Sequence, residues 1–300
     1  MKLSHRLWSR RRLLSTAAAT SAVTLLRPSR LLATESATCH LTPELTVGPY
    51  YVDYELLRSD IRENRPGLPL HLSIVVLNAR TCEPLSNAAV DIWHCDASGI
   101  YSGYTKMNPD KMDFGPGRPD GFDGPPPPPP GTLPQGPPQD GNHHDGDHNA
   151  PPQMHTTDKE TFLRGVQITG KDGTAKFLTI YPGWYVSRDT HIHLKVHTGG
   201  HGDHGKYTAG HVRHIGQIAF SDALSDQVAQ LEPYVSHKVT RTRLADDSVF
   251  HGDLSGITLH TTQVNQARLA DGLHGTITFT VDPEAEPGPE GFGGPTPSRQ

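Results

Sequence analysis

Short runs of alternating apolar and polar residues recur along the chain, which is typical of β-strands. In the segment 70–79 (LHLSIVVLNA), apolar side chains stand at every second position from Leu70 to Val76. Further runs of strand-like composition occupy 88–95, 162–169, 174–181, 191–197, 214–220, 256–262 and 275–281. Many short strands separated by turn residues predict an all-β fold: a β-sandwich of mainly antiparallel strands with long irregular loops.

Two local patterns add detail to this fold. The sequence GKDG at 170–173 joins two of the strand segments, 162–169 and 174–181, which predicts a β-hairpin with glycine in the turn. The segment 222–232 (DALSDQVAQLE) has a helical pattern and predicts one short helix.

Glycine and proline divide the chain into a folded domain and irregular segments. The 300 residues include 30 glycines and 27 prolines. We expect one domain at 39–283, interrupted by a Pro/Gly/His-rich insert at about 107–159 and followed by a disordered tail at 284–300. The histidines of the insert could bind a metal ion, but we favour a solvated loop, because such a loop lacks fixed geometry.

The first 38 residues have the features of an export signal. Consecutive arginines in SRRRLL at 9–14 precede a moderately apolar stretch that is too short to span a bilayer. This order predicts a twin-arginine-type signal and a periplasmic or extracellular protein; an uncleaved disordered arm is the alternative. The formal net charge of −5 argues against a nucleic-acid partner.

Three cysteines allow one disulfide and one free thiol. Cys95 stands next but one to Trp93 in a strand-like run, so we expect a free buried thiol there. Cys39 and Cys82 remain as the candidate disulfide, which export would permit.

The segment 181–196 (YPGWYVSRDTHIHLKV) holds the strongest candidate chemistry. His191 and His193 are two residues apart, so on a strand both imidazoles would point to one face and could bind a transition metal. The oxygen donors near them in sequence or just upstream are the phenols of Tyr101, Tyr104, Tyr181 and Tyr185. Phenolate donors favour a hard trivalent ion such as Fe(III). Taken alone, two such histidines are more often ordinary surface or core residues.

Longer motifs resemble one enzyme family. The segments 90–104 (VDIWHCDASGIYSGY), 177–196 (FLTIYPGWYVSRDTHIHLKV) and 46–51 (TVGPYY) together resemble the intradiol ring-cleavage dioxygenases, above all the protocatechuate dioxygenase β-subunit type and its secreted relatives. The resemblance covers about 43–106 and 160–282. The chain departs from the family in its long insert and at 199–211 (GGHGDHGKYTAGH).

The resemblance implies a non-haem Fe(III) centre. Tyr101 and Tyr185 would be the phenolate ligands, and His191 and His193 the imidazole ligands. Tyr104 and Tyr181 do not align with ligand positions and are expected to be structural.

The same resemblance assigns residues around the substrate. Arg188 would stabilise developing negative charge, Tyr185 would also act as a base, and Gln217 would be a polar pocket residue. Gly48, Pro49 and Tyr50 would line the mouth of the site. Trp184 would pack on the substrate ring, although a core position is an equal alternative.

The implied reaction is cleavage of a catechol-type substrate by O2, between the two hydroxylated carbons, to a muconate-type diacid. The alternative is a secreted, non-catalytic β-sandwich that binds sugars or peptides. Which catechol is cleaved, and whether the protein is a homodimer, is left open by the sequence.

Overall fold

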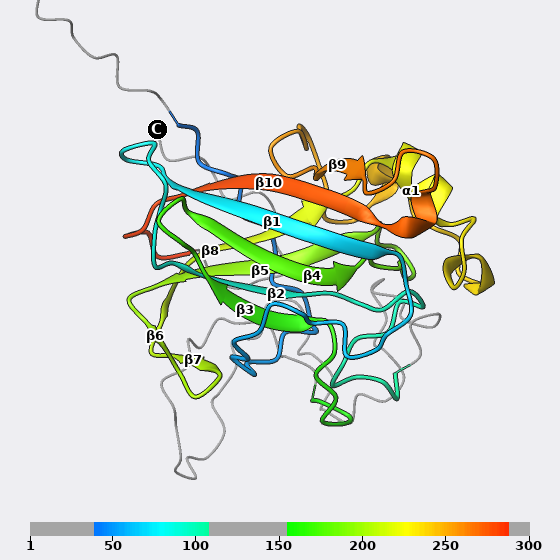
Figure 1. Ribbon diagram of the computed structural model, residues 1–300, viewed down its shortest axis with the longest axis horizontal. Coiled ribbons are helices and arrows are strands. Elements are labelled where there is room, and N and C mark those ends of the chain that lie inside the picture. Colours follow the sequence, from blue (N-terminus) through cyan, green and yellow to red (C-terminus); the bar gives the residue numbers. More distant parts are fainter. Residues whose placement is uncertain (1–38, 108–154, 288–300) are drawn as a thin grey trace, which may run out of the picture. The chain divides into compact units, whose positions relative to one another are not determined.

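The computed structural model describes residues 39–107 and 155–287. Over these ranges, the chain forms two four-stranded sheets, a further two-stranded sheet and one α-helix, α1 (Asp222–Val228). The prediction of an all-β fold with mainly antiparallel strands and one short helix is confirmed (Figure 1). The predicted signal at 1–38 and most of the insert and the tail lie outside the described residues.

The first sheet joins strands from both ends of the described chain. Its order is β4 (Thr174–Ile180), β1 (Pro69–Asn78), β10 (Leu273–Val281) and β9 (His260–Gln263). β1 runs antiparallel to β4 but parallel to β10, with Leu70 opposite Leu273. This long-range parallel pair has no local turn signal to predict it.

The second sheet is entirely antiparallel. Its order is β3 (Arg164–Ile168), β2 (Ala89–Trp93), β5 (His191–Thr198) and β8 (His211–Ala219). Between β5 and β8, a small hairpin of β6 (His201–Asp203) and β7 (Lys206–Thr208) occupies the segment in which the chain departs from the family pattern.

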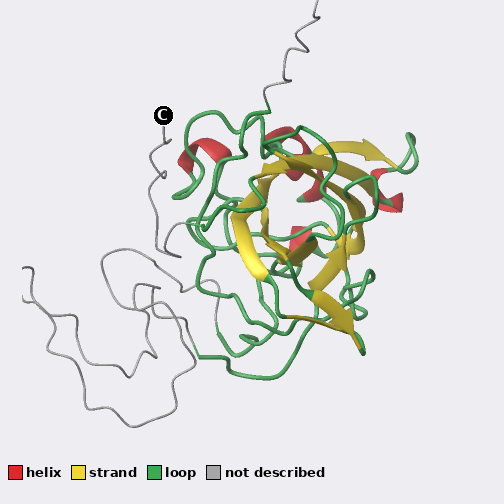
Figure 2. Cartoon of the chain, turned by 90° about the vertical axis from the view of Figure 1, so that its left-hand side faces the viewer, coloured by secondary structure: helices red, strands yellow, loops and turns green. Residues whose placement is uncertain are grey.

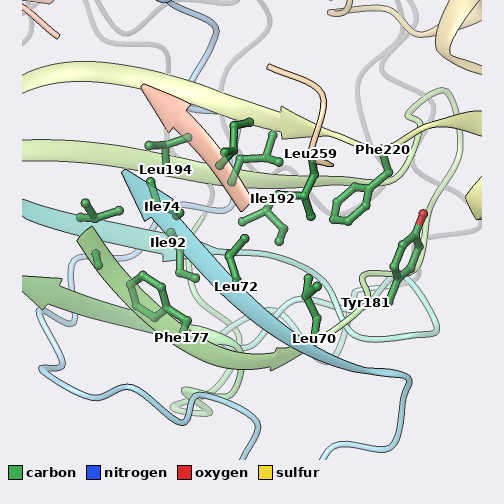
Figure 3. Close-up of a cluster of buried hydrophobic side chains, with 14 of the residues drawn as sticks. Leu70, Leu72, Ile74, Ile92, Phe177, Tyr181, Ile192, Leu194, Phe220 and Leu259 are labelled. Atoms are coloured by element: carbon green, nitrogen blue, oxygen red, sulfur yellow. The ribbon is translucent and has the colours of Figure 1, made fainter. Parts of the chain in front are cut away.

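The main core lies between the two four-stranded sheets. Alternate residues of β1, from Leu70 to Val76, are buried there, because successive residues of a strand point to opposite faces. They pack against apolar side chains of the second sheet, among them Ile92, Ile192 and Leu194 (Figure 3).

The second sheet is buried on its other face as well. All of β2 and the residues His191–Val196 of β5 are buried. A second apolar cluster covers this outer face and joins residues of the N-terminal segment to loop tyrosines: Val47, Tyr50, Tyr51, Trp93, Cys95, Tyr101, Tyr104, Tyr185 and Ile215. The candidate site therefore lies beneath loops on the outer face of a sheet. Figure 2 shows how much of the described chain is loop.

The predicted hairpin at 162–181 is wrong. β3 pairs with β2 in one sheet, whereas β4 pairs with β1 in the other. The turn is present, since the N–H of Gly173 donates to the carbonyl of Gly170, but it carries the chain from sheet to sheet. Each strand pairs along its whole length with a strand of its own sheet, β3 with β2 and β4 with β1.

Two element boundaries also differ from expectation. The predicted strand at 256–262 begins only at His260, because Ile257 and Leu259 hydrogen-bond instead to Ala219 at the end of β8. The predicted helix at 222–232 ends at Val228 and continues as a tighter turn, in which the N–H of Leu231 donates to the carbonyl of Val228. Short 3₁₀ turns follow at Tyr234–Ser236, Leu244–Asp246 and Leu269–Asp271.

The cysteine predictions are confirmed. Cys39 and Cys82 form a disulfide with their Cα atoms 5.6 Å apart, and Cys95 is buried and free. Among the described residues, no helix has the length and apolar character needed to cross a membrane.

Candidate active site

Two histidines of β5 stand at the centre of the buried outer face. His191 and His193 are both almost fully inaccessible to solvent. His193 lies opposite Trp93 of β2 on one side and Gln217 of β8 on the other. Because residues i and i+2 of a strand share a face, both imidazoles point the same way, and their Nε2 atoms are 3.1 Å apart.

The backbone selects the tautomer of His191. Its Nδ1–H donates to the carbonyl of Asp189 at 2.6 Å, so its Nε2 carries a lone pair. The ring of His193 is held differently, by stacking on the indole of Trp93 with the ring centroids 5.0 Å apart.

Two tyrosines from separate loops bring their hydroxyl groups to the same point. The Oη of Tyr101 lies 3.4 Å from the Nε2 of His191, and the Oη of Tyr185 lies 3.3 Å from it. Both phenol rings are buried. The four predicted ligand residues are thus brought together by two loops and one strand.

The loops that carry Tyr101 and Tyr185 contact each other through their backbones, and this contact requires a glycine in each loop. A Cβ on Gly99 would lie 2.4 Å from the carbonyl oxygen of Trp184, and a Cβ on Gly183 would lie 2.6 Å from that of Ala97. Only glycine permits so close an approach. These contacts hold the loop of Tyr101 against the loop of Tyr185.

Burial sets the protonation of the four side chains. It raises the pKa of Tyr185 to about 12, although the nearby guanidinium of Arg188 pulls that pKa down. Burial also raises the pKa of Tyr101 well above its ordinary value, and the neighbouring Tyr185 adds to the shift. Burial lowers the pKa of His191 and of His193 well below the usual value. At neutral pH, the imidazoles are therefore neutral and able to bind a metal, and the phenols ionise only for a cation that binds the phenolate.

The donor geometry fits a single metal ion. Ligand atoms about 2.1 Å from one ion lie about 3.0 to 3.4 Å from their neighbours. The three distances at the Nε2 of His191 are 3.1, 3.3 and 3.4 Å. Within 39–107 and 155–287, no group of three or more His, Cys, Asp or Glu residues could hold a metal. A metal here would need the phenols, and phenolate oxygens suit a hard ferric ion.

Arg188 is buried beside the tyrosines and held by two acceptors. Its Nε donates to both carboxylate oxygens of Asp247, at 3.0 and 3.2 Å, and its Nη2 donates to the Oε1 of Gln217 at 2.6 Å. The amide of Gln217 in turn donates to the carbonyl of Thr46 at 2.8 Å. Gln217 therefore links the arginine to the N-terminal segment.

The N-terminal segment lies against His193. Gly48 has a φ of +72°, and a Cβ there would lie 2.9 Å from the Cε1 of His193. Pro49 is half-buried. The ring of Tyr50 stacks on Tyr101 with the centroids 4.3 Å apart.

The remaining aromatic residues have packing positions. Trp184 lies in the main core, and its indole N–H donates to the carbonyl of Val239. The position of Trp184 therefore agrees better with a role in the core than with packing on a substrate ring. Tyr181 also lies in the main core, with its hydroxyl 2.7 Å from that of Ser225. Tyr104 packs edge-on against Tyr50.

Sequence reasoning missed the acidic and basic residues that surround the site. Asp247 holds Arg188, and Arg241 binds the buried carboxylate of Asp189 at 2.8 Å. Arg164, also buried, donates to the carbonyls of Tyr50 and Ser102. No spacing or motif marks these residues, because their partners are distant in sequence.

Comparison with known proteins finds similar solved structures. No protein-family model matches the sequence, and no curated protein is similar enough to count as a match. A solved intradiol ring-cleavage dioxygenase from Tetranychus urticae is 27% identical, with a TM-score of 0.60, over 83% of this chain and 98% of that chain. A second solved dioxygenase is 26% identical, with a TM-score of 0.59, over 83% and 97% of the two chains. In its fold and in the motifs around the four converging side chains, the chain is similar to the intradiol ring-cleavage dioxygenases.

Proposed function

We propose that this protein is a non-haem Fe(III) dioxygenase that cleaves a catechol between its two hydroxylated carbons to give a muconate-type diacid. One observation carries the proposal: two phenol oxygens and the Nε2 of His193 lie within 3.4 Å of the Nε2 of His191. Tyr101, Tyr185, His191 and His193 would hold the iron. When bound, ferric iron would act as a Lewis acid and draw electron density from the catecholate, which makes the ring reactive towards O2.

Tyr185 is proposed to have a second role as a base. A catechol that binds through both oxygens must lose two protons. The phenolate of Tyr185 can accept one of them, because burial gives this phenol a pKa of about 12. The neighbouring cation of Arg188 opposes that rise in pKa and keeps the phenolate accessible.

Arg188 and Gln217 are proposed to stabilise negative charge that develops on the substrate. The guanidinium is buried, so its interaction with an oxyanion would be only weakly screened by water. Gly48, Pro49 and Tyr50 would form the wall beside the histidines. Both atoms of O2 enter the product, so the reaction consumes no external reductant.

Oxygen uptake and ultraviolet spectra test the proposal directly. The iron-loaded protein is offered catechol, protocatechuate, hydroxyquinol and bulkier lignin-type catechols. We expect a red to burgundy protein, because tyrosinates bound to Fe(III) give a visible charge-transfer band, and O2 consumption in step with a muconate-type product. A yellow semialdehyde from cleavage outside the two hydroxylated carbons would contradict the proposal, and so would a colourless protein that contains iron.

A non-catalytic binding module is the alternative. Such a module would have no need to bury two phenols and two imidazoles around one point. It would bind its ligand without consuming O2, so the same assay separates the two functions.

We also propose that the protein is exported and loses its N-terminal signal segment, with cleavage between Ala33 and Cys39. The disulfide between Cys39 and Cys82 supports export, because disulfides persist in oxidising compartments. The mass of the secreted protein tests this, and a mature chain that retains its N-terminal arginines would contradict it.

A further inference from the structure

Asp247 is a fully buried carboxylate with many partners. Its side chain has no exposed surface. Its Oδ2 accepts the N–H of Asp189 at 2.6 Å as well as the Nε–H of Arg188 at 3.0 Å. Its Oδ1 accepts the N–H groups of Val249 and Phe250 at 2.8 and 2.9 Å. A buried charge with this set of donors is stabilised in one orientation.

The two carboxylate oxygens of Asp247 have different main partners. The Oδ1 closes the local turn from Asp247 to Phe250 and accepts the Nε–H of Arg188 only at the longer distance of 3.2 Å. The Oδ2 reaches across to the turn before β5 and binds the consecutive residues Arg188 and Asp189. The carbonyl of the same Asp189 accepts the Nδ1–H of His191. Asp247 therefore holds the short segment that carries both the guanidinium and the support of a candidate ligand.

The guanidinium of Arg188 is constrained on three sides. Asp247 binds its Nε, Gln217 binds its Nη2, and the ring of Phe250 lies 5.5 Å from its Cζ. Phe250 belongs to the turn that Asp247 closes. An arginine held in this way loses little conformational freedom when an oxyanion binds it.

We infer that Asp247 is the positioning residue for Arg188 in ring cleavage, an inference that rests on the proposed function. Asp247 fixes the direction of the guanidinium before substrate arrives and does not itself touch the substrate. A purely structural role, in which Asp247 only stabilises the loop at 244–250, is the competing explanation.

The substitution Asp247→Asn separates these two roles. The amide oxygen can still close the turn, whereas the NH2 group replaces Oδ2 and opposes the donors of Arg188 and Asp189. We expect kcat to fall about 10²-fold, with a much smaller change in KM, because charge stabilisation in the transition state is lost. Iron content and the visible band should change far less than kcat, because the carbonyl of Asp189 is still present to accept the Nδ1–H of His191. The matched control is Asp246→Asn, which removes an exposed carboxylate from the same loop and should leave kcat unchanged.

A double variant shows whether Asp247 acts through Arg188. In an Arg188→Gln background, Asp247→Asn should lower kcat by no more than about 2-fold, since coupled residues are not additive. The same 10²-fold loss in both backgrounds would overturn the inference, as would normal kcat in Asp247→Asn. If Asp247→Asn does not fold, Asp247→Ser can close the turn without reaching Arg188 and gives the same test.

A crystal structure of Asp247→Asn gives a readout that does not depend on activity. We expect the guanidinium to leave Gln217, and an unmoved Arg188 would contradict the inference. A wild-type protein that consumes no O2 with any catechol would refute the proposed function alone, because the position of Arg188 in the variant would still be measurable.

Discussion

Acid should destabilise this protein through histidines buried in the core, and His214 allows the effect to be isolated. His214 lies on β8, is 3% exposed and contacts the ring of Phe279 edge-on. Its Nε2 has no hydrogen-bond partner within 39–107 and 155–287. Burial lowers the pKa of His214 from 6.5 to about 4. The folded protein therefore binds a proton at this site far less readily than the unfolded chain.

The sign and the size of the effect follow from this shift. Above the unfolded pKa of 6.5, both states hold a neutral imidazole, and the full stability is present. As the pH falls from 6.5 towards 4, the unfolded chain binds a proton at this histidine and the folded protein does not, so the free energy of unfolding decreases. At pH 5 the loss is about 2 kcal/mol, and below pH 4 it approaches about 3.4 kcal/mol.

The substitution His214→Leu removes the titrating group and leaves an apolar side chain in an apolar site. We measure the free energy of unfolding in urea at about pH 7.5 and pH 5 for the variant and the wild type. The variant should gain about 2 kcal/mol relative to the wild type between the two pH values. The control is His211→Leu, which removes an exposed histidine from the same strand.

The comparison between variant and wild type is needed because other buried groups titrate in the same range. Burial lowers the pKa of His94 and of His197 to about 4, so both add to the loss of stability in acid. Burial raises the pKa of Asp91 from 3.8 to about 7, so the folded protein keeps a proton that the unfolded chain loses. Asp91 therefore acts in the opposite direction: its effect lowers the stability as the pH rises from 3.8 towards 7. These contributions cancel in the difference. An unchanged pH dependence in His214→Leu would refute the reasoning.

Three further substitutions test the site and the fold. Gly48→Ala places a Cβ 2.9 Å from the Cε1 of His193 and should lower the bound iron per chain. The control is Gly252→Ala, which has a similar positive φ but open space around it and should keep its iron. Equal iron in both variants would show that the contact with His193 is unimportant. Tyr185→Phe should keep iron, shift the visible band and lower turnover by about 10²-fold or more, and near wild-type turnover would refute the role of Tyr185 as a base. Cys82→Ser opens a loop with a sequence separation of 43 and should cost about 4 kcal/mol of unfolding free energy, measured in urea. A reductant should destabilise the wild type but not this variant, and equal sensitivity would contradict the assignment.

Local periodicity and local chemistry were sufficient for much of the architecture. The alternation from Leu70 to Val76 predicts which side chains of β1 enter the core, because successive residues of a strand point to opposite faces. The same rule places His191 and His193 on one face. The two tyrosines follow from the family resemblance of their loops. Their convergence on His191 is a property of the fold.

Only the tertiary structure decided which segments become neighbours. The turn at 170–173 has the composition of a hairpin turn but joins two sheets, because β3 and β4 find different partner strands. Asp247 meets Arg188 across 59 positions of sequence, in a loop with no recognisable motif. A local sequence pattern predicts the face of the strand or helix to which each side chain points. Pairing depends on how much apolar surface every segment can bury and on which buried charges find partners, and both depend on the whole chain at once.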